Sequence, residues 1–153
     1  MDVMQLWGRW YAAFEASAVD DQWDRLAPLL ADDVQYRVTG VPFACTLKGR
    51  EAVIAGFARS FAGFDRKFDR RTHQVVSIRE HAPGHLEAQI RGVYEKDGLP
   101  PLAFPATGHW HLDGDRIGLM VDIYDPTLAE SQAAFGWLAA YGEKLGGLNP
   151  SYT

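Results

Sequence analysis

The segment DRIGLMVDIYD, residues 115–125, places a carboxylate among apolar neighbours. Its aliphatic residues predict a buried strand, and Asp122 lies near the end of that strand between Val121 and Ile123. A carboxylate in such surroundings is costly unless it is paired, hydrogen-bonded or neutralised by a shifted pKa. Because groups of this kind can transfer protons, Asp122 is the first candidate for acid or base chemistry.

The sequence HWH, residues 109–111, suggests a second kind of chemistry. Strand alternation places its two histidines on one face, where His81 or His85 could join them as zinc ligands. No acid or cysteine ligand accompanies them in the sequence, so we expect no metal site. Cys45, the only cysteine, has no neighbour that would lower the pKa of its thiol, and we expect a free thiol rather than a nucleophile.

Three helices are predicted in the first half of the chain to hold these side chains. Aromatic residues at positions 7, 10, 11 and 14 share one helical face, which predicts an amphipathic helix over residues 3–18. The segments QWDRLAPLLA and REAVIAGFARSFAGF predict the second and third helices. Between them, VQYRV is typical of a strand and TGVPFACTLKG of a loop.

The second half is predicted to be mostly strands. Strand-like runs in residues 73–125 are separated by the turn sequences HAPG, KDGLPP and DGD, which favour antiparallel hairpins. A capping-box spacing from Thr127 to Glu130 predicts a C-terminal helix over residues 126–146, followed by a tail, 147–153. Helices followed by strands indicate an α+β fold, with helices on one face of a curved antiparallel sheet and an apolar pocket at its open end.

The composition of the chain limits the classes of function that are expected. A chain of 153 residues fits one domain, and five Trp, six Tyr and eight Phe can line a pocket. The net charge of −5, without a basic stripe, argues against nucleic acid as a partner. The sequence lacks a signal-peptide pattern and an apolar run of membrane-spanning length, so we expect a soluble, cytoplasmic protein without a membrane partner.

The order of elements, with the segments LLADDVQY, KGREAV and DGDRI, resembles the SnoaL-like branch of the nuclear transport factor 2-like superfamily. The resemblance covers nearly the whole chain and implies a single SnoaL-like domain, residues 1–153, with a cone-shaped curved antiparallel sheet. It also implies that three helices from the N-terminal half wrap the sheet and that the C-terminal helix is an addition. The superfamily contains isomerases, dehydratases, cyclases, epoxide hydrolases and non-enzymes, so the fold alone does not give the reaction.

Two enzyme sites of the superfamily match only in part. Tyr11 resembles the tyrosine of ketosteroid isomerase, but the two acids of that enzyme fall near Val38 and Gly108. Limonene epoxide hydrolase is closer, because Asp122 and Asp125 resemble the acids of its closing strand, while Tyr36 resembles its water-holding tyrosine and Arg91 the arginine of its relay. Its water-binding asparagine and second relay acid match Val38 and Val93.

Polyketide cyclases and dehydratases of the SnoaL type offer a third comparison. The cyclases carry an acid at the end of the closing strand, which matches Asp125 or Asp122. The dehydratases carry a histidine at the start of a strand, which His73 resembles, and an acid after the first helix, where Asp20 and Asp21 lie. The resemblance therefore implies a possible dyad of His73 and Asp21.

The resemblance turns Asp122 and Arg91 toward the cavity, where a guanidinium would keep the carboxylate ionised. This pair has two interpretations, catalytic or purely structural. Tyr36 and His73 complete the expected catalytic set. The expected substrate-binding wall consists of Tyr11, Val38, Phe43, Val93, Phe104, Trp110, Met120 and Tyr124.

The sequence thus predicts a cofactor-independent enzyme of cyclase, dehydratase or isomerase type, acting by general acid and base catalysis on a small apolar molecule that carries oxygen. An epoxide hydrolase of the limonene type is one alternative. A non-catalytic module that binds a small ligand is another. We also expect a homodimer, and the C-terminal helix could either cap the pocket or join the dimer interface.

Overall fold

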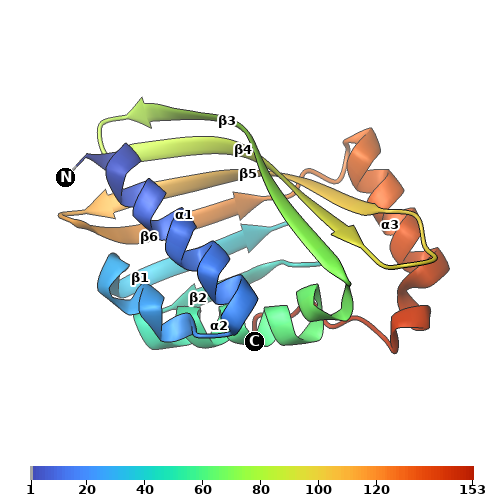
Figure 1. Ribbon diagram of the computed structural model, residues 1–153. Helices are drawn as coiled ribbons and strands as arrows, with labels where there is room; N and C mark the ends of the chain where they lie inside the picture. The colour runs from blue at the N-terminus through green and yellow to red at the C-terminus, as the bar shows by residue number, and fades with distance from the viewer. Residues whose placement is uncertain (1) are drawn as a thin grey trace.

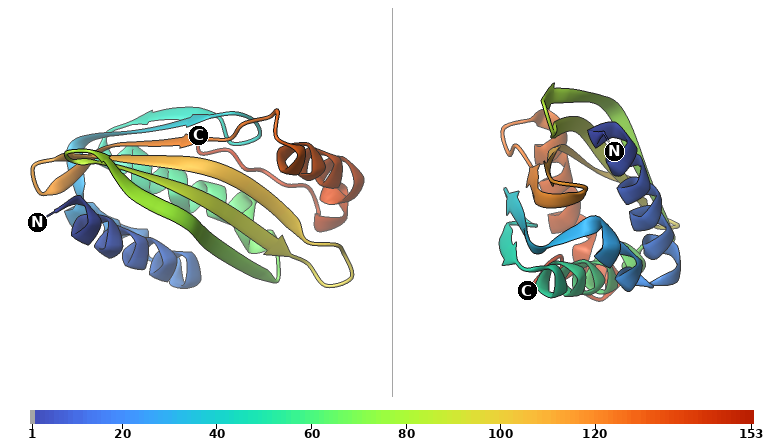
Figure 2. Two further views of the ribbon diagram at one scale, coloured as in Figure 1. Left: turned by 90° about the horizontal axis from the view of Figure 1, so that it is seen from above. Right: turned by 90° about the vertical axis from the view of Figure 1, so that its left-hand side faces the viewer.

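The protein is described by a computed structural model covering residues 2–153, in which helices cross one face of a curved sheet (Figure 1). Helix α1 spans Val3–Asp20 and helix α2 spans Arg50–Gly63, as the spacing of apolar residues predicts. A capping box between Asp2 and Gln5 starts α1. Both helices lie on the same side of the sheet, where their aromatic side chains fill the core (Figure 2).

Six strands form one sheet in the order β2-β1-β6-β5-β4-β3. Their bounds are Leu30–Thr39 for β1, Cys45–Lys48 for β2, Arg70–Ala82 for β3, His85–Glu95 for β4, Leu102–Asp113 for β5 and Arg116–Ile123 for β6. The last four form the expected antiparallel meander. In contrast, β1 and β6 pair in parallel, so the sheet is mixed rather than wholly antiparallel. No turn joins these two strands, so turn chemistry did not indicate their relative direction.

Three local predictions differ from the structure. The expected loop between β1 and α2 contains strand β2, and the expected second helix is a 3-10 helix, Trp23–Leu29, that contains Pro28. Helix α3 spans only Ala129–Tyr141 and is followed by a 3-10 turn, Gly142–Leu145. Its N-cap is Leu128 without a side-chain cap, because Thr127 bonds instead to Asp125.

Helix α3 lies at the end of the sheet far from the N-terminus (Figures 1 and 2). There Trp137 donates a hydrogen bond to the Pro100 carbonyl oxygen at 2.7 Å and packs its ring on Phe68. From α3 the chain runs back along α2 to the C-terminus (Figure 1). Within residues 2–153, no helix combines the length and apolar character needed to cross a membrane.

Candidate functional site

Two small cavities lie between the helices and the concave face of the sheet. The tryptophan lobe, about 60 Å³, is lined on one side by Trp10 and Trp110. The tyrosine lobe, about 70 Å³, is lined by Tyr94, Tyr124 and Tyr152. Both lobes share one wall, which makes them parts of a single interior site. The shared residues are Phe14, Tyr36, His73, Ile90 and Asp122.

Asp122 lies at the centre of this shared wall. Its Oδ2 accepts a hydrogen bond of 2.6 Å from the hydroxyl of Tyr36, on the neighbouring strand β1. Its Oδ1 has no hydrogen-bond partner in residues 2–153. Gly108 faces Asp122 from β5, and a Cβ at that position would lie 3.3 Å from Oδ1 and 2.6 Å from the Trp110 ring. The missing side chain therefore lets the Trp110 ring pack over Gly108 beside the free carboxylate oxygen.

The protonation of Asp122 is set by its surroundings. Burial raises the pKa of Asp122 to about 6, and the hydrogen bond from Tyr36 opposes part of that rise. Burial and the neighbouring Asp122 carboxylate raise the pKa of Tyr36 well above its ordinary value, so Tyr36 remains a donor. Asp122 can consequently hold or release a proton close to neutral pH, as a general acid or base must.

His73 lies on the same concave face, on β3. Its Nδ1 is 3.7 Å from Oε1 of Glu15 on α1, and both atoms are buried without a hydrogen-bond partner in the described residues. Burial and the charge of Arg71 lower the pKa of His73 to about 4, so the imidazole is neutral at physiological pH. The hydroxyl of Tyr11 donates to the His73 carbonyl oxygen at 3.1 Å, which joins α1 to this strand.

A partly buried ion cluster borders the tyrosine lobe. Arg71 donates to Glu15 Oε2 at 2.9 Å and to Asp65 Oδ2 at 3.0 Å. Burial raises the pKa of Asp65 to about 6, although Arg71 opposes this rise. None of these three residues is among those predicted from the sequence. Strand alternation would have indicated Arg71, which lies two residues from His73, and helical spacing would have indicated Glu15, four residues from Tyr11.

Arg91 does not pair with Asp122, so the predicted ion pair is wrong. Its guanidinium forms an ion pair with Glu130 of α3 and donates to Gln74 Oε1 at 3.3 Å. In β4 it alternates with Ile90 and Gly92, which line the lobes, and it therefore lies on the opposite face of the sheet. Val93 shares the face of Arg91, so its predicted place in the cavity wall is also wrong.

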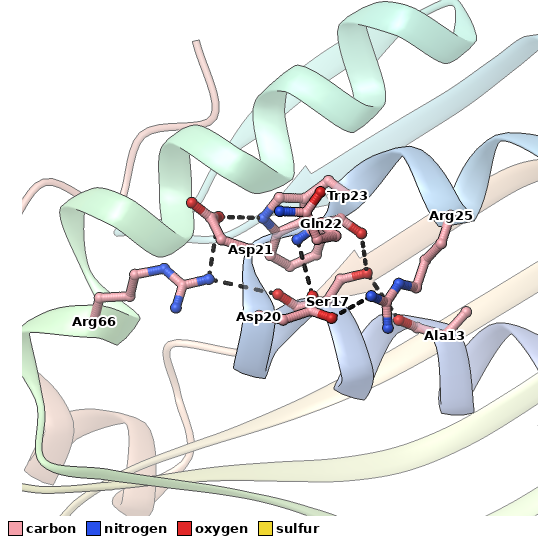
Figure 3. Close-up of polar contacts among 8 residues, drawn as sticks. All are labelled: Ala13, Ser17, Asp20, Asp21, Gln22, Trp23, Arg25 and Arg66. Atoms are coloured by element: carbon pink, nitrogen blue, oxygen red, sulfur yellow. Dashed lines mark hydrogen bonds and ion pairs between the residues drawn. The ribbon is translucent and has the colours of Figure 1, made fainter.

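The two alternative acids lie outside the cavity. Asp21 accepts hydrogen bonds from Trp23 Nε1 at 2.7 Å and from Arg66 at 3.1 Å in an exposed turn after α1 (Figure 3). A dyad of His73 and Asp21 is therefore wrong, and Glu15 is the acid beside His73. Asp125 accepts from the Thr127 hydroxyl at 2.7 Å, also on the surface, and the bonds from Thr127 lower the pKa of Asp125.

Most of the expected wall residues do line the site, although their role in binding stays a prediction. Val38 is buried and lies beside Asp122 in the parallel pair, but it lines neither lobe. The structure adds Tyr152 from the C-terminal tail, which no sequence signal had indicated. The expected residues that line one lobe or the other are Tyr11, Phe43, Phe104, Trp110, Met120 and Tyr124.

The remaining histidines gather on the outer face of the sheet. Nε2 of His85 is 2.8 Å from Nδ1 of His109, and the His85 ring stacks on His111. Across residues 2–153, no group of three or more His, Cys, Asp or Glu side chains is arranged to hold a metal ion. Cys45 is half-buried, and burial together with the charge of Asp122 raises the pKa of its thiol to about 11.

Solved structures with the same fold come from several bacteria. A protein from Catenulispora acidiphila DSM 44928 with a ketosteroid isomerase-like fold, in complex with trimethylamine, is 22% identical, with a TM-score of 0.62 over 85% of this chain and 94% of that one. A candidate SnoaL-like polyketide cyclase from Jannaschia sp. CCS1 is 16% identical, with a TM-score of 0.69 over 90% of this chain and 92% of that one.

An LEH-like epoxide hydrolase from M. tuberculosis is 17% identical, with a TM-score of 0.60 over 86% of this chain and 91% of that one. Identities this low establish a shared fold and no more. A search of curated proteins found no match. The family model of the SnoaL-like domain matches residues 7–120, which is most of the chain. The chain therefore belongs to the SnoaL-like domain family.

Proposed function

We propose that this protein is an enzyme that needs no cofactor and performs general acid and base chemistry on a small, largely apolar molecule carrying oxygen. The proposal rests on the surroundings of the Asp122 carboxyl group. Its carboxyl is partly buried and has no cationic partner in the described residues. One oxygen is held by Tyr36, and the other is free beside the cavity. A structural carboxylate in a protein interior is normally paired, so an unpaired one favours a functional role.

The mechanism starts with the Asp122 carboxylate as base. Its free Oδ1 takes a proton from a carbon next to a carbonyl group, while Tyr36 keeps the carboxylate oriented through Oδ2. The protonated carboxyl then returns the proton to a leaving hydroxyl group in elimination or to another carbon in isomerisation. In cyclisation the carbanion forms a bond to a second carbonyl carbon, and the proton goes to the alkoxide oxygen that this attack produces. One group can thus support elimination, cyclisation or isomerisation, and the lyase or cyclase type ranks first because the ketosteroid isomerase acids are absent at Val38 and Gly108.

His73 supplies the second polar group. The Glu15 carboxylate on the Nδ1 side favours the tautomer with hydrogen on Nδ1, and the Nε2 lone pair then accepts a hydrogen bond from a substrate hydroxyl. Because His73 stays neutral, it does not add a second charge to a cavity that already holds the Asp122 carboxylate. The aromatic walls of both lobes suit the apolar part of such a substrate.

Hydrolysis of an epoxide is the second candidate. The hydroxyl of Tyr36 beside Asp122 and the similarity to the M. tuberculosis enzyme favour it. The position of Arg91 on the far face removes the arginine of the expected relay, so this reaction ranks lower. A non-catalytic ligand-binding module is the remaining alternative. The lobes are several times smaller than typical ligand pockets of roughly 300 Å³ or more, which limits the size of a substrate and of a ligand alike.

The test is a substrate screen with matched variants. The wild-type protein is incubated with hydroxy-ketones, polyketide-like enols and epoxides, and Asp122→Asn is compared with Asp125→Asn, whose carboxyl lies on the surface. We expect Asp122→Asn to lower kcat by about 10² or more with an unchanged circular dichroism spectrum, and Asp125→Asn to keep wild-type activity. Full activity in Asp122→Asn would refute the mechanism. Ligand binding without turnover by the wild type would favour the module.

A further inference from the structure

The C-terminal segment, residues 147–153, returns from α3 along α2 and completes the site (Figure 1). Three hydrogen bonds attach it to the end of α2. They run from Asn149 N to Gly63 O at 2.9 Å, from Ser60 Oγ to Pro150 O at 3.0 Å and from an Arg59 guanidinium nitrogen to Tyr152 O at 2.8 Å. The segment is therefore attached along its length rather than free at the surface.

The sequence of α2 permits this segment to pack closely against the helix. Gly56, Ser60 and Gly63 follow each other at helical spacing and share one face. A Cβ at Gly56 would lie 2.5 Å from Leu47 of β2 and 3.1 Å from the Tyr152 carbonyl oxygen, and a Cβ at Gly63 would overlap the Asn149 carbonyl oxygen. Glycine inside a helix costs about 1 kcal/mol relative to alanine, so these two glycines lower the helical propensity of α2 while permitting close docking of the tail.

From this segment, Tyr152 contacts the wall that the two lobes share. Only 9% of the residue is exposed, and its ring packs edge-on against Tyr36 and Phe57. Its hydroxyl oxygen lies 3.5 Å from that of Tyr36. Tyr36 has a single hydroxyl hydrogen, and the much shorter 2.6 Å contact assigns that hydrogen to Asp122. With that hydrogen given to Asp122, the contact between the two tyrosines is a hydrogen bond only when Tyr152 is the donor.

We propose that Tyr152 is a positioning residue that holds the Tyr36 hydroxyl with its hydrogen directed at Asp122. A donated hydrogen bond polarises the accepting hydroxyl and makes it a better donor in turn, so the chain from Tyr152 through Tyr36 stabilises the Asp122 carboxylate. The catalytic consequence of this arrangement rests on the proposed function. The hydrogen-bond chain itself does not, and it can be measured without a substrate.

The experiment follows the titration of the Asp122 carboxyl carbon by ¹³C NMR in four proteins. They are the wild type, Tyr152→Phe, Tyr36→Phe and, as the matched control, Tyr141→Phe on α3, which lies outside both lobes. We expect Tyr36→Phe to raise the pKa of Asp122 by about one unit, Tyr152→Phe to raise it by a few tenths, and Tyr141→Phe to leave it unchanged. An unchanged titration in Tyr152→Phe would overturn the inference, since phenylalanine keeps the ring packing.

A second variant moves the tail without altering Tyr152. Gly63→Ala places a methyl group against the Asn149 carbonyl oxygen and should displace the segment, which the amide NMR shifts of Asn149 and of residues 151–153 would report. The pKa of Asp122 should then rise as it does in Tyr152→Phe. Displaced amide signals with an unchanged Asp122 titration would also overturn the inference. A shifted titration in a protein that turns over no substrate would keep the positioning role and refute the enzyme proposal.

Discussion

The hydroxyl of Tyr36 donates a 2.6 Å hydrogen bond to Asp122 across the parallel pair of β1 and β6, between residues 86 positions apart in the chain. This bond is the only one from a side chain to the Asp122 carboxylate within residues 2–153. One neutral donor compensates little of the cost of burying a charge, which is why the pKa of Asp122 stays at about 6. The site thus keeps a carboxyl whose protonation can change near neutral pH.

Removing the Asp122 charge should change how stability depends on pH. The pKa of Asp122 is raised from 3.8 to about 6 on folding, so the folded state binds more protons than the unfolded state between these values. The Asp122 charge therefore lowers the free energy of unfolding as pH rises from about 4 to about 6. Urea unfolding should show Asp122→Asn gaining roughly 2–3 kcal/mol relative to wild type over this window.

Asp125→Asn is the control for this measurement. The pKa of Asp125 is lowered by the hydrogen bonds from Thr127, so its removal should change the pH slope in the opposite direction. A difference between Asp122→Asn and wild type that is constant from pH 4 to pH 8 would contradict a raised pKa at Asp122.

His73 should have the opposite effect on the pH profile. Its pKa falls from 6.5 to about 4 on folding. Between these pH values the unfolded chain therefore binds a proton at His73 and the folded protein does not. The contribution of His73 to wild-type stability should therefore decline as pH drops from about 6.5 to about 4, opposite in sign to the contribution of Asp122. His73→Gln should lack this decline, and its stability relative to wild type should improve by roughly 3 kcal/mol across the window. Parallel profiles for the two proteins would show that His73 titrates normally.

Strand alternation read from the sequence placed Met120, Asp122 and Tyr124 on the cavity face correctly. Arg91 was placed on the wrong face because it was matched to the arginine of a family relay and not to the alternation of its own strand. In HLEAQIRGVYE the buried residues alternate from Leu86 to Tyr94, and this pattern alone turns Arg91 outward. Tyr152 had no such signal, because an irregular tail has no period that indicates which side chains face the core.

The packing of Trp110 beside Asp122 should be sensitive to a single methyl group at position 108. In Gly108→Ala the new Cβ would lie 2.6 Å from the Trp110 ring, so the ring must move or the strand must shift. We expect a loss of roughly 1–3 kcal/mol in the free energy of unfolding, with a change in tryptophan fluorescence. The matched control is Gly136→Ala on α3, which has open space at its Cβ and should stabilise the protein by up to about 1 kcal/mol. Equal effects at both positions would contradict this packing.

Arg91→Gln tests whether Arg91 holds the Asp122 carboxylate, as the sequence predicts, or pairs with Glu130, as the structure has it. If Arg91 held the Asp122 charge, its removal would raise the pKa of Asp122 and abolish activity. The structure instead pairs Arg91 with Glu130 of α3 on the outer face, and such half-exposed pairs contribute about 1 kcal/mol or less. We therefore expect Arg91→Gln to leave the ¹³C titration of Asp122 and the turnover of any identified substrate unchanged, with a small loss of thermal stability. A raised pKa of Asp122 in this variant would mean that the guanidinium reaches the cavity in solution, and the proposed mechanism would then need Arg91 as the partner of the carboxylate.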